Sequence, residues 1–145
     1  MTLAAVAISG GIDSLVSAYL LKAAGHEVVG LHFLTGFEDS PAPQEDARHP
    51  IHGLGAQLGI PIQILDLSTT FRRTVVDYFS TSYQAGRTPN PCLFCNPIIK
   101  FGHLWNYASR LGADFLATGH YARITRDPVG DCRLLRGVDR HKDQS

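Results

Sequence analysis

The sequence has few of the features that would fix its class at once. It contains only three cysteines in 145 residues, an odd number, and two of them stand three residues apart. A secreted domain held together by disulfides needs a larger and even set, so that class is excluded. No apolar run approaches the roughly 18 residues of a membrane span, and no charged-then-apolar leader opens the chain. The sequence therefore predicts a cytoplasmic protein that does not enter a membrane.

Net charge is also absent, because 13 basic residues balance 13 acidic ones. This excludes a protein that binds nucleic acid through an overall basic surface. The balance hides an asymmetry, since residues 1–86 carry four Lys or Arg against eight Asp or Glu, whereas residues 87–145 carry nine against five. The basic residues near the end of the chain are predicted to contact phosphates of a polyanion: Arg123, Arg126, Arg133, Arg136, Arg140 and Lys142.

The chain does have an alternating pattern of apolar runs and helical periodicity. Residues 3–8 form a continuous apolar run, typical of a strand buried on both faces, and a glycine turn and a helical pattern follow. A second apolar run at 28–33 completes a βαβ unit, which requires parallel strands. Further strands, the last two as a hairpin, are predicted at 61–66, 115–118, 121–126 and 132–138. We expect one α/β domain, a three-layer sandwich around a parallel sheet.

The loop at residues 9–14, Ser-Gly-Gly-Ile-Asp-Ser, joins the first predicted strand to the first helix. Ligands of open α/β sheets bind at the carboxyl ends of the strands, where this loop lies. Glycines let the backbone approach an anion, and the N–H groups of the helix start point toward it. Asp13 can cap the helix or hold a phosphate-bound Mg²⁺ through water. The spacing fits neither a Walker loop nor G-x-G-x-x-G, and a simple Gly-Gly turn is the alternative.

Cys92 and Cys95 form a C-x-x-C pair directly after Pro91. Proline suits the first position of a helix, so both thiols are expected on one face of its first turns. The helix start, with Arg87 or Lys100 nearby, should lower the pKa of such a thiol and make it a better nucleophile. Inert structural thiols, a redox dithiol and a metal site are the alternatives. The candidates for the further ligands of a metal site are Cys132, His103 and His120.

Four blocks of sequence occur in an order that matches a known family. The loop at 9–14 has the form S-G-G-x-D-S, the signature of ATP pyrophosphatases, which cut ATP between its α and β phosphates. The other blocks are G-R-T-P-N-P-x-x-x-C-N at 86–96, A-T-G-H-Y-A-R at 117–123, and L-L-R-G-V-D at 134–139 with K-D-Q-S at 142–145. Together they resemble the tRNA-specific 2-thiouridylases over nearly the whole chain. The resemblance implies an adenine-nucleotide α-hydrolase-like fold, with residues 1–145 as a PP-loop catalytic domain that ends near the start of a tRNA-binding region.

The resemblance also implies an activity, the ATP-dependent 2-thiolation of the wobble uridine of tRNA. ATP adenylates the C2 oxygen, pyrophosphate leaves, and sulfur from a cysteine persulfide then displaces AMP. The implied nucleophile is Cys95, and Cys92 is a second catalytic candidate that stands where many relatives carry Asp. The implied ATP contacts are Ala7, Ile8, Ser9, Gly10, Gly11, Ile12, Asp13, Ser14, Phe33 and Gly119. The implied tRNA contacts are Asn90, Pro91, Cys92, Lys142, Asp143 and Gln144.

The implied cofactors are ATP and Mg²⁺, and the implied partners are tRNA and a protein that donates persulfide sulfur. An iron–sulfur cluster on Cys92 and Cys95 is an alternative, because C-x-x-C forms among related thiolases carry one. The family's persulfide-carrying cysteine lies downstream, so these 145 residues alone are expected to be inactive. Two other functions stay open: another PP-loop enzyme, such as a 4-thiouridine synthetase or an amidating ligase, and a non-catalytic nucleotide- or metal-binding module.

Overall fold

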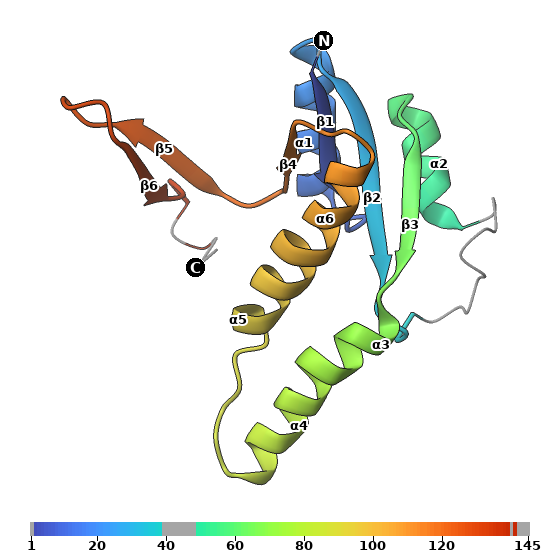
Figure 1. Ribbon diagram of the computed structural model, residues 1–145, viewed down its shortest axis with the longest axis vertical. Helices are drawn as coiled ribbons and strands as arrows, with labels where there is room; N and C mark the ends of the chain where they lie inside the picture. Colours follow the sequence, from blue (N-terminus) through green and yellow to red (C-terminus); the bar gives the residue numbers. More distant parts are fainter. Residues whose placement is uncertain (1, 39–48, 140, 142–145) are drawn as a thin grey trace.

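A parallel sheet forms the centre of the molecule, for which a computed structural model describes residues 2–38, 49–139 and 141. The sheet has four strands in the order β3-β2-β1-β4 (Figure 1). Their bounds are β1 Leu3–Ala7, β2 Glu27–Leu34, β3 Ile62–Asp66 and β4 Phe115–Ala117. In the central register, Ala5 of β1 lies between Val29 of β2 and Leu116 of β4. The predicted parallel α/β sheet is confirmed.

Side chains of the strands alternate between two hydrophobic clusters, one on each face of the sheet. Ala4 and Val6 belong to the cluster that packs against the first two helices, α1 (Ile12–Ala23) and α2 (Pro50–Leu58). Ala5 belongs to the cluster on the opposite face, which includes Leu31, Leu104 and Ala108. Because apolar side chains cover both faces, the strands read as continuous apolar runs in the sequence. Helices on both faces make the three layers that the sequence predicts.

Residues at the ends of α2 explain where this helix begins and stops. Pro50 is the first helical residue, and the His49 side chain accepts a hydrogen bond from the Ile51 N–H. Gly59 ends the helix in the left-handed conformation, with φ of 61°. Gly55 lies in the contact with the sheet, because a Cβ there would be 2.7 Å from Ile62 Cγ1. The absence of a side chain lets α2 pack closely on β3.

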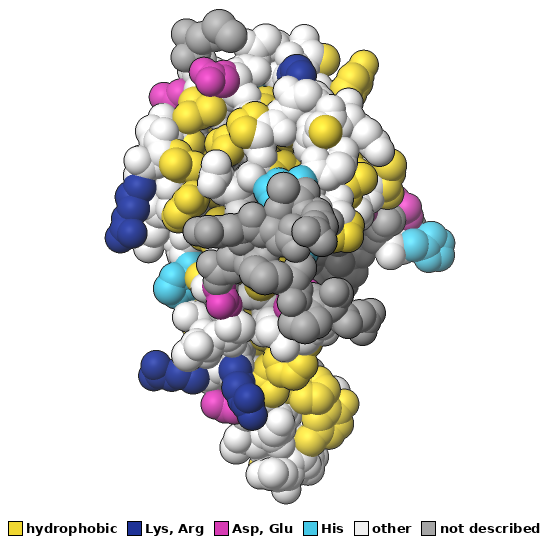
Figure 2. Space-filling model, turned by 90° about the vertical axis from the view of Figure 1, so that its right-hand side faces the viewer, with side chains coloured by type: hydrophobic (Ala, Val, Ile, Leu, Met, Phe, Trp, Pro, Cys, Tyr) yellow, Lys and Arg dark blue, Asp and Glu magenta, His cyan; other side chains and the backbone are white. Residues whose placement is uncertain are grey.

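The chain between β3 and β4 forms two helical arms that meet far from the sheet (Figure 1). The descending arm is α3 (Ser68–Phe71), the π-helix η1 (Arg72–Val76) and α4 (Asp77–Gln84). The returning arm is α5 (Cys92–Phe94), the π-helix η2 (Cys95–Leu104) and α6 (Trp105–Arg110). Figure 2 shows hydrophobic side chains on the lower part of the molecule. In α4, the exposed apolar residues are Phe79 and Tyr83. In the part of the chain described, no helix has the length and hydropathy required to cross a bilayer.

The predicted hairpin is also confirmed, as β5 (Ala122–Arg126) paired antiparallel with β6 (Cys132–Arg136). It extends away from the sheet, and every residue of its two strands is exposed (Figure 1). Asp127 closes its turn by accepting the N–H groups of Val129 and Asp131, each at 3.0 Å. The basic residues of the hairpin therefore stand in solvent, where a polyanion can reach them.

Leu104 is the buried anchor of the returning arm on the sheet, with no exposed surface. Replacing it by Ala should lower the free energy of unfolding by about 3 kcal/mol, because the lost side chain leaves a cavity among packed neighbours. Urea unfolding followed by circular dichroism measures the change. Leu20→Ala is the matched control, since Leu20 is 59% exposed and should cost less than about 1 kcal/mol. Equal losses in the two variants would contradict this packing.

Candidate nucleotide site

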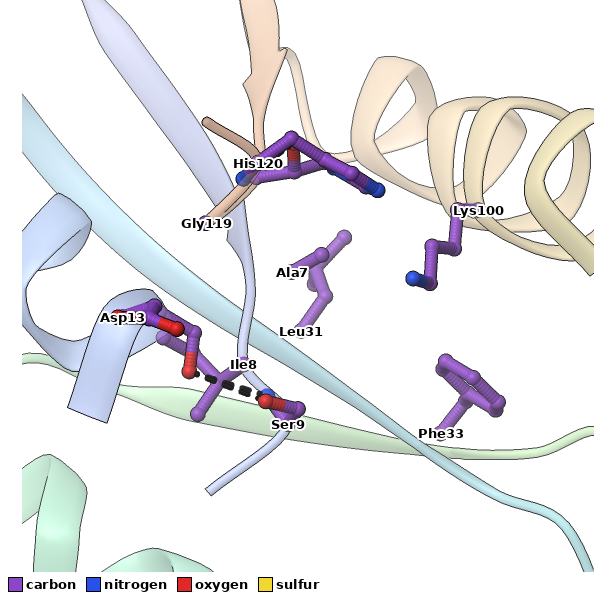
Figure 3. Close-up of a pocket in the computed structure, with 11 residues that line it drawn as sticks. Ala7, Ile8, Ser9, Asp13, Leu31, Phe33, Lys100, Gly119 and His120 are labelled. Atoms are coloured by element: carbon purple, nitrogen blue, oxygen red, sulfur yellow. Dashed lines mark hydrogen bonds between the residues drawn. The ribbon is translucent and has the colours of Figure 1, made fainter. Parts of the chain in front are cut away.

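A cavity opens at the point where the strand order reverses. The chain passes from β1 outward to β2 and β3 and then returns to β4 on the other side of β1. Ligands of open α/β sheets bind at such a reversal, beyond the carboxyl ends of the strands. The cavity has a volume of about 160 Å³ (Figure 3). Its lining residues are Ala7, Ile8, Ser9, Asp13, Ser14, Leu31, Phe33, Lys100, Thr118, Gly119 and His120.

The cavity brings together most of the residues predicted to contact ATP. Of the ten, seven line it: Ala7, Ile8, Ser9, Asp13, Ser14, Phe33 and Gly119. Gly10, Gly11 and Ile12 belong to the same loop and helix start but lie outside the lining, and Ile12 is 71% exposed. Residues from the ends of three strands converge here because parallel strands present their carboxyl ends at one edge of the sheet.

Internal hydrogen bonds give the loop at 9–14 a curled shape around the start of α1. The Ser14 hydroxyl accepts the Ser9 N–H at 3.3 Å and donates to the Gly11 carbonyl at 2.8 Å. Gly10 has φ of +88°, a conformation that favours glycine. The N-cap residue of α1 is Gly11, which has no side chain to cap the helix, and Asp13 lies in the first turn. The start of α1 brings the positive end of the helix dipole to this loop, which favours an anion there.

Gly119 holds the loop after β4 against the start of α1. A Cβ at this position would lie 2.9 Å from the Ser14 nitrogen and 3.0 Å from the Asp13 carbonyl carbon. Both neighbours are backbone atoms of a helix, so they cannot yield as a flexible side chain would. The Ser17 hydroxyl also reaches the Thr118 carbonyl, at 3.4 Å. Two loops that are over 100 residues apart in sequence are thereby fixed as two sides of one cavity.

Tyr121 forms a second link between these loops. Its hydroxyl donates a hydrogen bond to Asp13 Oδ1 at 2.6 Å. The carboxylate accepts the phenolic proton, and this bond raises the pKa of Tyr121 above its usual range. The sequence reasoning did not select Tyr121, although it stands only two residues after Gly119. The chain pattern carries no signal for this contact, because Asp13 is 108 residues away.

Lys100 and His120 complete the cavity on the side opposite the glycine loop (Figure 3). Burial lowers the pKa of His120, and the positive charge of Lys100 lowers it further, so the imidazole is neutral at pH 7. Lys100 comes from η2, the helix that begins at Cys95. The sequence reasoning placed Lys100 near the cysteines but did not place it at the nucleotide loop.

The cysteine pair lies outside the cavity, at the start of the returning arm. Cys92 is exposed and Cys95 is half-buried, and both are free thiols. The predicted lowering of the thiol pKa is wrong for Cys95. Burial raises the pKa of Cys95, and the nearby Lys100 charge offsets only part of this effect. The helix expected to stabilise a thiolate is also very short, since α5 ends at Phe94 and the π-helix follows at once.

A metal site at the cysteine pair finds no further ligands in residues 2–38 and 49–139. No three His, Cys, Asp or Glu side chains in this part of the chain are grouped so that they could hold a metal ion. Cys132, one candidate ligand, lies in the exposed hairpin strand β6. Among the described residues, Cys92 and Cys95 are therefore not joined by the further ligands that an iron–sulfur cluster would need.

Three of the predicted tRNA contacts, Asn90, Pro91 and Cys92, follow one another at the start of the returning arm. Asn90 and Pro91 form the turn that leads into α5, and the Asn90 N–H faces the Tyr78 hydroxyl at 3.5 Å. The rings of Tyr78 and Phe94 lie beside this turn, and their centroids are 4.2 Å apart. Lys142, Asp143 and Gln144 lie outside the described residues.

A parallel sheet with a glycine loop and a helix start at its strand reversal defines an adenine-nucleotide α-hydrolase-like domain. A family model described as "tRNA methyl transferase HUP domain" matches residues 2–145, and the chain belongs to this family. A tRNA-specific 2-thiouridylase MnmA of Desulfosudis oleivorans is 52% identical over 143 residues, which cover 99% of this chain and 38% of that protein. The same-named protein of Trichlorobacter lovleyi is 46% identical over 145 residues, covering 100% of this chain and 41% of the relative. The predicted resemblance is confirmed, and the chain spans about two fifths of the length of these relatives.

The bond between Tyr121 and Asp13 makes a prediction about titration. The phenol of Tyr121 should lose its proton at a higher pH than an ordinary tyrosine, because the Asp13 carboxylate accepts that proton in a hydrogen bond. Asp13→Asn should return the pKa of Tyr121 toward its usual range. The ring-carbon NMR shift of Tyr121, followed from pH 8 to 12, measures the midpoint. A midpoint that Asp13→Asn leaves unchanged would contradict the assignment, and Asp139→Asn serves as a control with a smaller effect.

Proposed function

We propose that this chain is the ATP-using catalytic domain of an enzyme that converts the C2 oxygen of the wobble uridine of tRNA to sulfur. The observation that carries the proposal is the cavity at the strand reversal, where the S-G-G-x-D-S loop, Phe33 and Gly119 meet. Membership of a family whose relatives are named tRNA-specific 2-thiouridylases supplies the substrate class. Residues 1–145 would form the PP-loop domain, and tRNA and a persulfide donor would be its partners.

The geometry suits an ATP molecule laid across the edge of the sheet. Phe33 and Leu31 offer an apolar wall for the adenine ring, and the loop at 9–14 offers N–H and hydroxyl donors for the phosphates. Asp13 is the side chain that would hold a phosphate-bound Mg²⁺, after giving up its bond to Tyr121. Attack of the uridine oxygen on the α-phosphorus then releases pyrophosphate beside the glycine loop.

Sulfur transfer belongs to the cysteine segment. The outer sulfur of a cysteine persulfide bonds to C2, and AMP leaves with the former uridine oxygen. The Cys95 thiolate then attacks the donor's inner sulfur, which breaks the S–S bond, leaves the electron pair on the 2-thio group and forms a disulfide. Because burial raises the pKa of Cys95, its proton must be removed when the substrate arrives. Cys92 is exposed and lies three residues before Cys95, and it is the second catalytic candidate of this segment.

Gly119 tests the nucleotide half of the proposal. Gly119→Ala should lower ATP-dependent pyrophosphate release by at least about tenfold, because the added Cβ pushes the loop after β4 away from the start of α1. A pyrophosphate-coupled assay with tRNA measures the rate. Gly53→Ala in α2 is the control, since a Cβ there meets nothing within 4 Å and should leave the rate unchanged. Full activity of Gly119→Ala would exclude this cavity as the ATP site.

The cysteines test the sulfur half. Cys95→Ser in the intact protein should stop formation of 2-thiouridine but retain pyrophosphate release, because ATP is activated in a different part of the fold. Nucleoside analysis of tRNA incubated with ATP and a persulfide source gives the readout. Cys132→Ser, on the hairpin, should behave as the unaltered protein. Equal failure of Cys92→Ser and Cys95→Ser, with loss of bound iron, would show a cluster in place of a nucleophile.

A further inference from the structure

Lys100 places a positive charge in the nucleotide cavity. Among the described residues, no acidic side chain forms an ion pair with it. Its amine points from η2 into the cavity, across from Ser9 and Asp13 (Figure 3). Among residues 2–38 and 49–139 it makes no hydrogen bond and no ion pair. The side chain is half-buried, and a cation partly removed from water is stabilised by an anion beside it.

The other charged or titratable groups of the cavity do not fill this role. The Asp13 carboxylate accepts the hydrogen bond of Tyr121, and His120 is a neutral imidazole. Within the described residues, the cavity lining contains no other Lys or Arg. Among the described residues that line the cavity, Lys100 is therefore the one cationic side chain available to an incoming anion.

The π-helical form of η2 explains how this lysine relates to the cysteine segment. An α-helix turns about 100° per residue, so two residues five apart would point about 140° away from each other. In a π-helix the hydrogen bonds join residues five apart, which sets Lys100 one turn above Cys95 on the same side. Pro97 lacks the N–H that an α-helix would use, and Gly102 stacks over the Pro97 carbonyl, where a Cβ would come within 3.0 Å.

We propose that Lys100 binds the phosphate that stays on adenosine, the α-phosphate of ATP and later of AMP, while the glycine loop binds the pyrophosphate that leaves. The assignment rests on the proposed function and adds a residue to its site. The start of α1 and the loop at 9–14 form one side of the cavity, and Lys100 forms the other. Because Lys100 and Cys95 share one helix, the retained phosphate also anchors the segment that carries the thiol close to the reacting uridine.

This division of the phosphates is tested by binding of three small probes to the intact protein: adenosine, AMP and Mg²⁺-pyrophosphate. Lys100→Met should weaken AMP about tenfold or more relative to adenosine, because it removes a charge-assisted hydrogen bond to phosphate. Its affinity for pyrophosphate should stay within about twofold of the unaltered protein. Ser9→Ala should show the reverse pattern, and Lys100→Arg should recover most of the AMP affinity. Isothermal titration measures all four proteins.

The outcomes separate this assignment from the function on which it rests. An unchanged ratio of AMP to adenosine affinity in Lys100→Met overturns it, and so does an equal loss of pyrophosphate affinity. If the substitution disturbs the structure in general, adenosine binding should also weaken, and Lys100→Arg should show the same loss. That result would also count against a phosphate contact of Lys100. If the unaltered protein binds none of the three probes, the proposed function itself falls.

Discussion

The close approach of Gly119 to the backbone at the start of α1 is the contact on which the site depends. The loop after β4 and the loop after β1 enclose one cavity only because no side chain stands between them. Parallel pairing of β1 with β4 brings the two loops to the same edge, and the missing Cβ removes the last obstacle. The bonds of Ser17 and Tyr121 then hold the same two segments together from either side.

The nucleotide cavity and the cysteine pair lie on different parts of the fold. The nucleotide cavity is built on strand ends that are packed from both faces, whereas the cysteines start an arm that leaves the sheet. That arm packs on the sheet through Leu104 and Ala108. Lys100 lies between the anchor and the cysteines and is the point where the arm reaches the cavity. A phosphate bound by Lys100, as proposed, would therefore connect the arm to the cavity.

The sequence was sufficient for the features that depend on local pattern. Apolar runs located the strands, because the sheet is covered on both faces, and the carboxyl-end rule brought the loop at 9–14, Phe33 and Gly119 together. Lys100 was missed as a cavity residue, and Tyr121 was missed as the partner of Asp13. Both positions follow from tertiary packing, and Tyr121 meets Asp13 across 108 residues. The pKa of Cys95 was predicted in the wrong direction for the same reason, since burial is not visible in a motif.

The raised pKa of Cys95 has a consequence for the order of events. A thiolate formed at all times at an open helix start would react with any electrophile in the solvent, and the exposed Cys92 beside it would invite a disulfide. The half-buried Cys95 keeps its proton more firmly, and in the proposed reaction a base would remove that proton once the substrate is bound. The Lys100 charge offsets part of the effect of burial on the pKa of Cys95, and a phosphate paired with Lys100, as proposed, would weaken this offset. In the proposed reaction, release of AMP would free the Lys100 charge again before the Cys95 thiolate attacks the donor's sulfur.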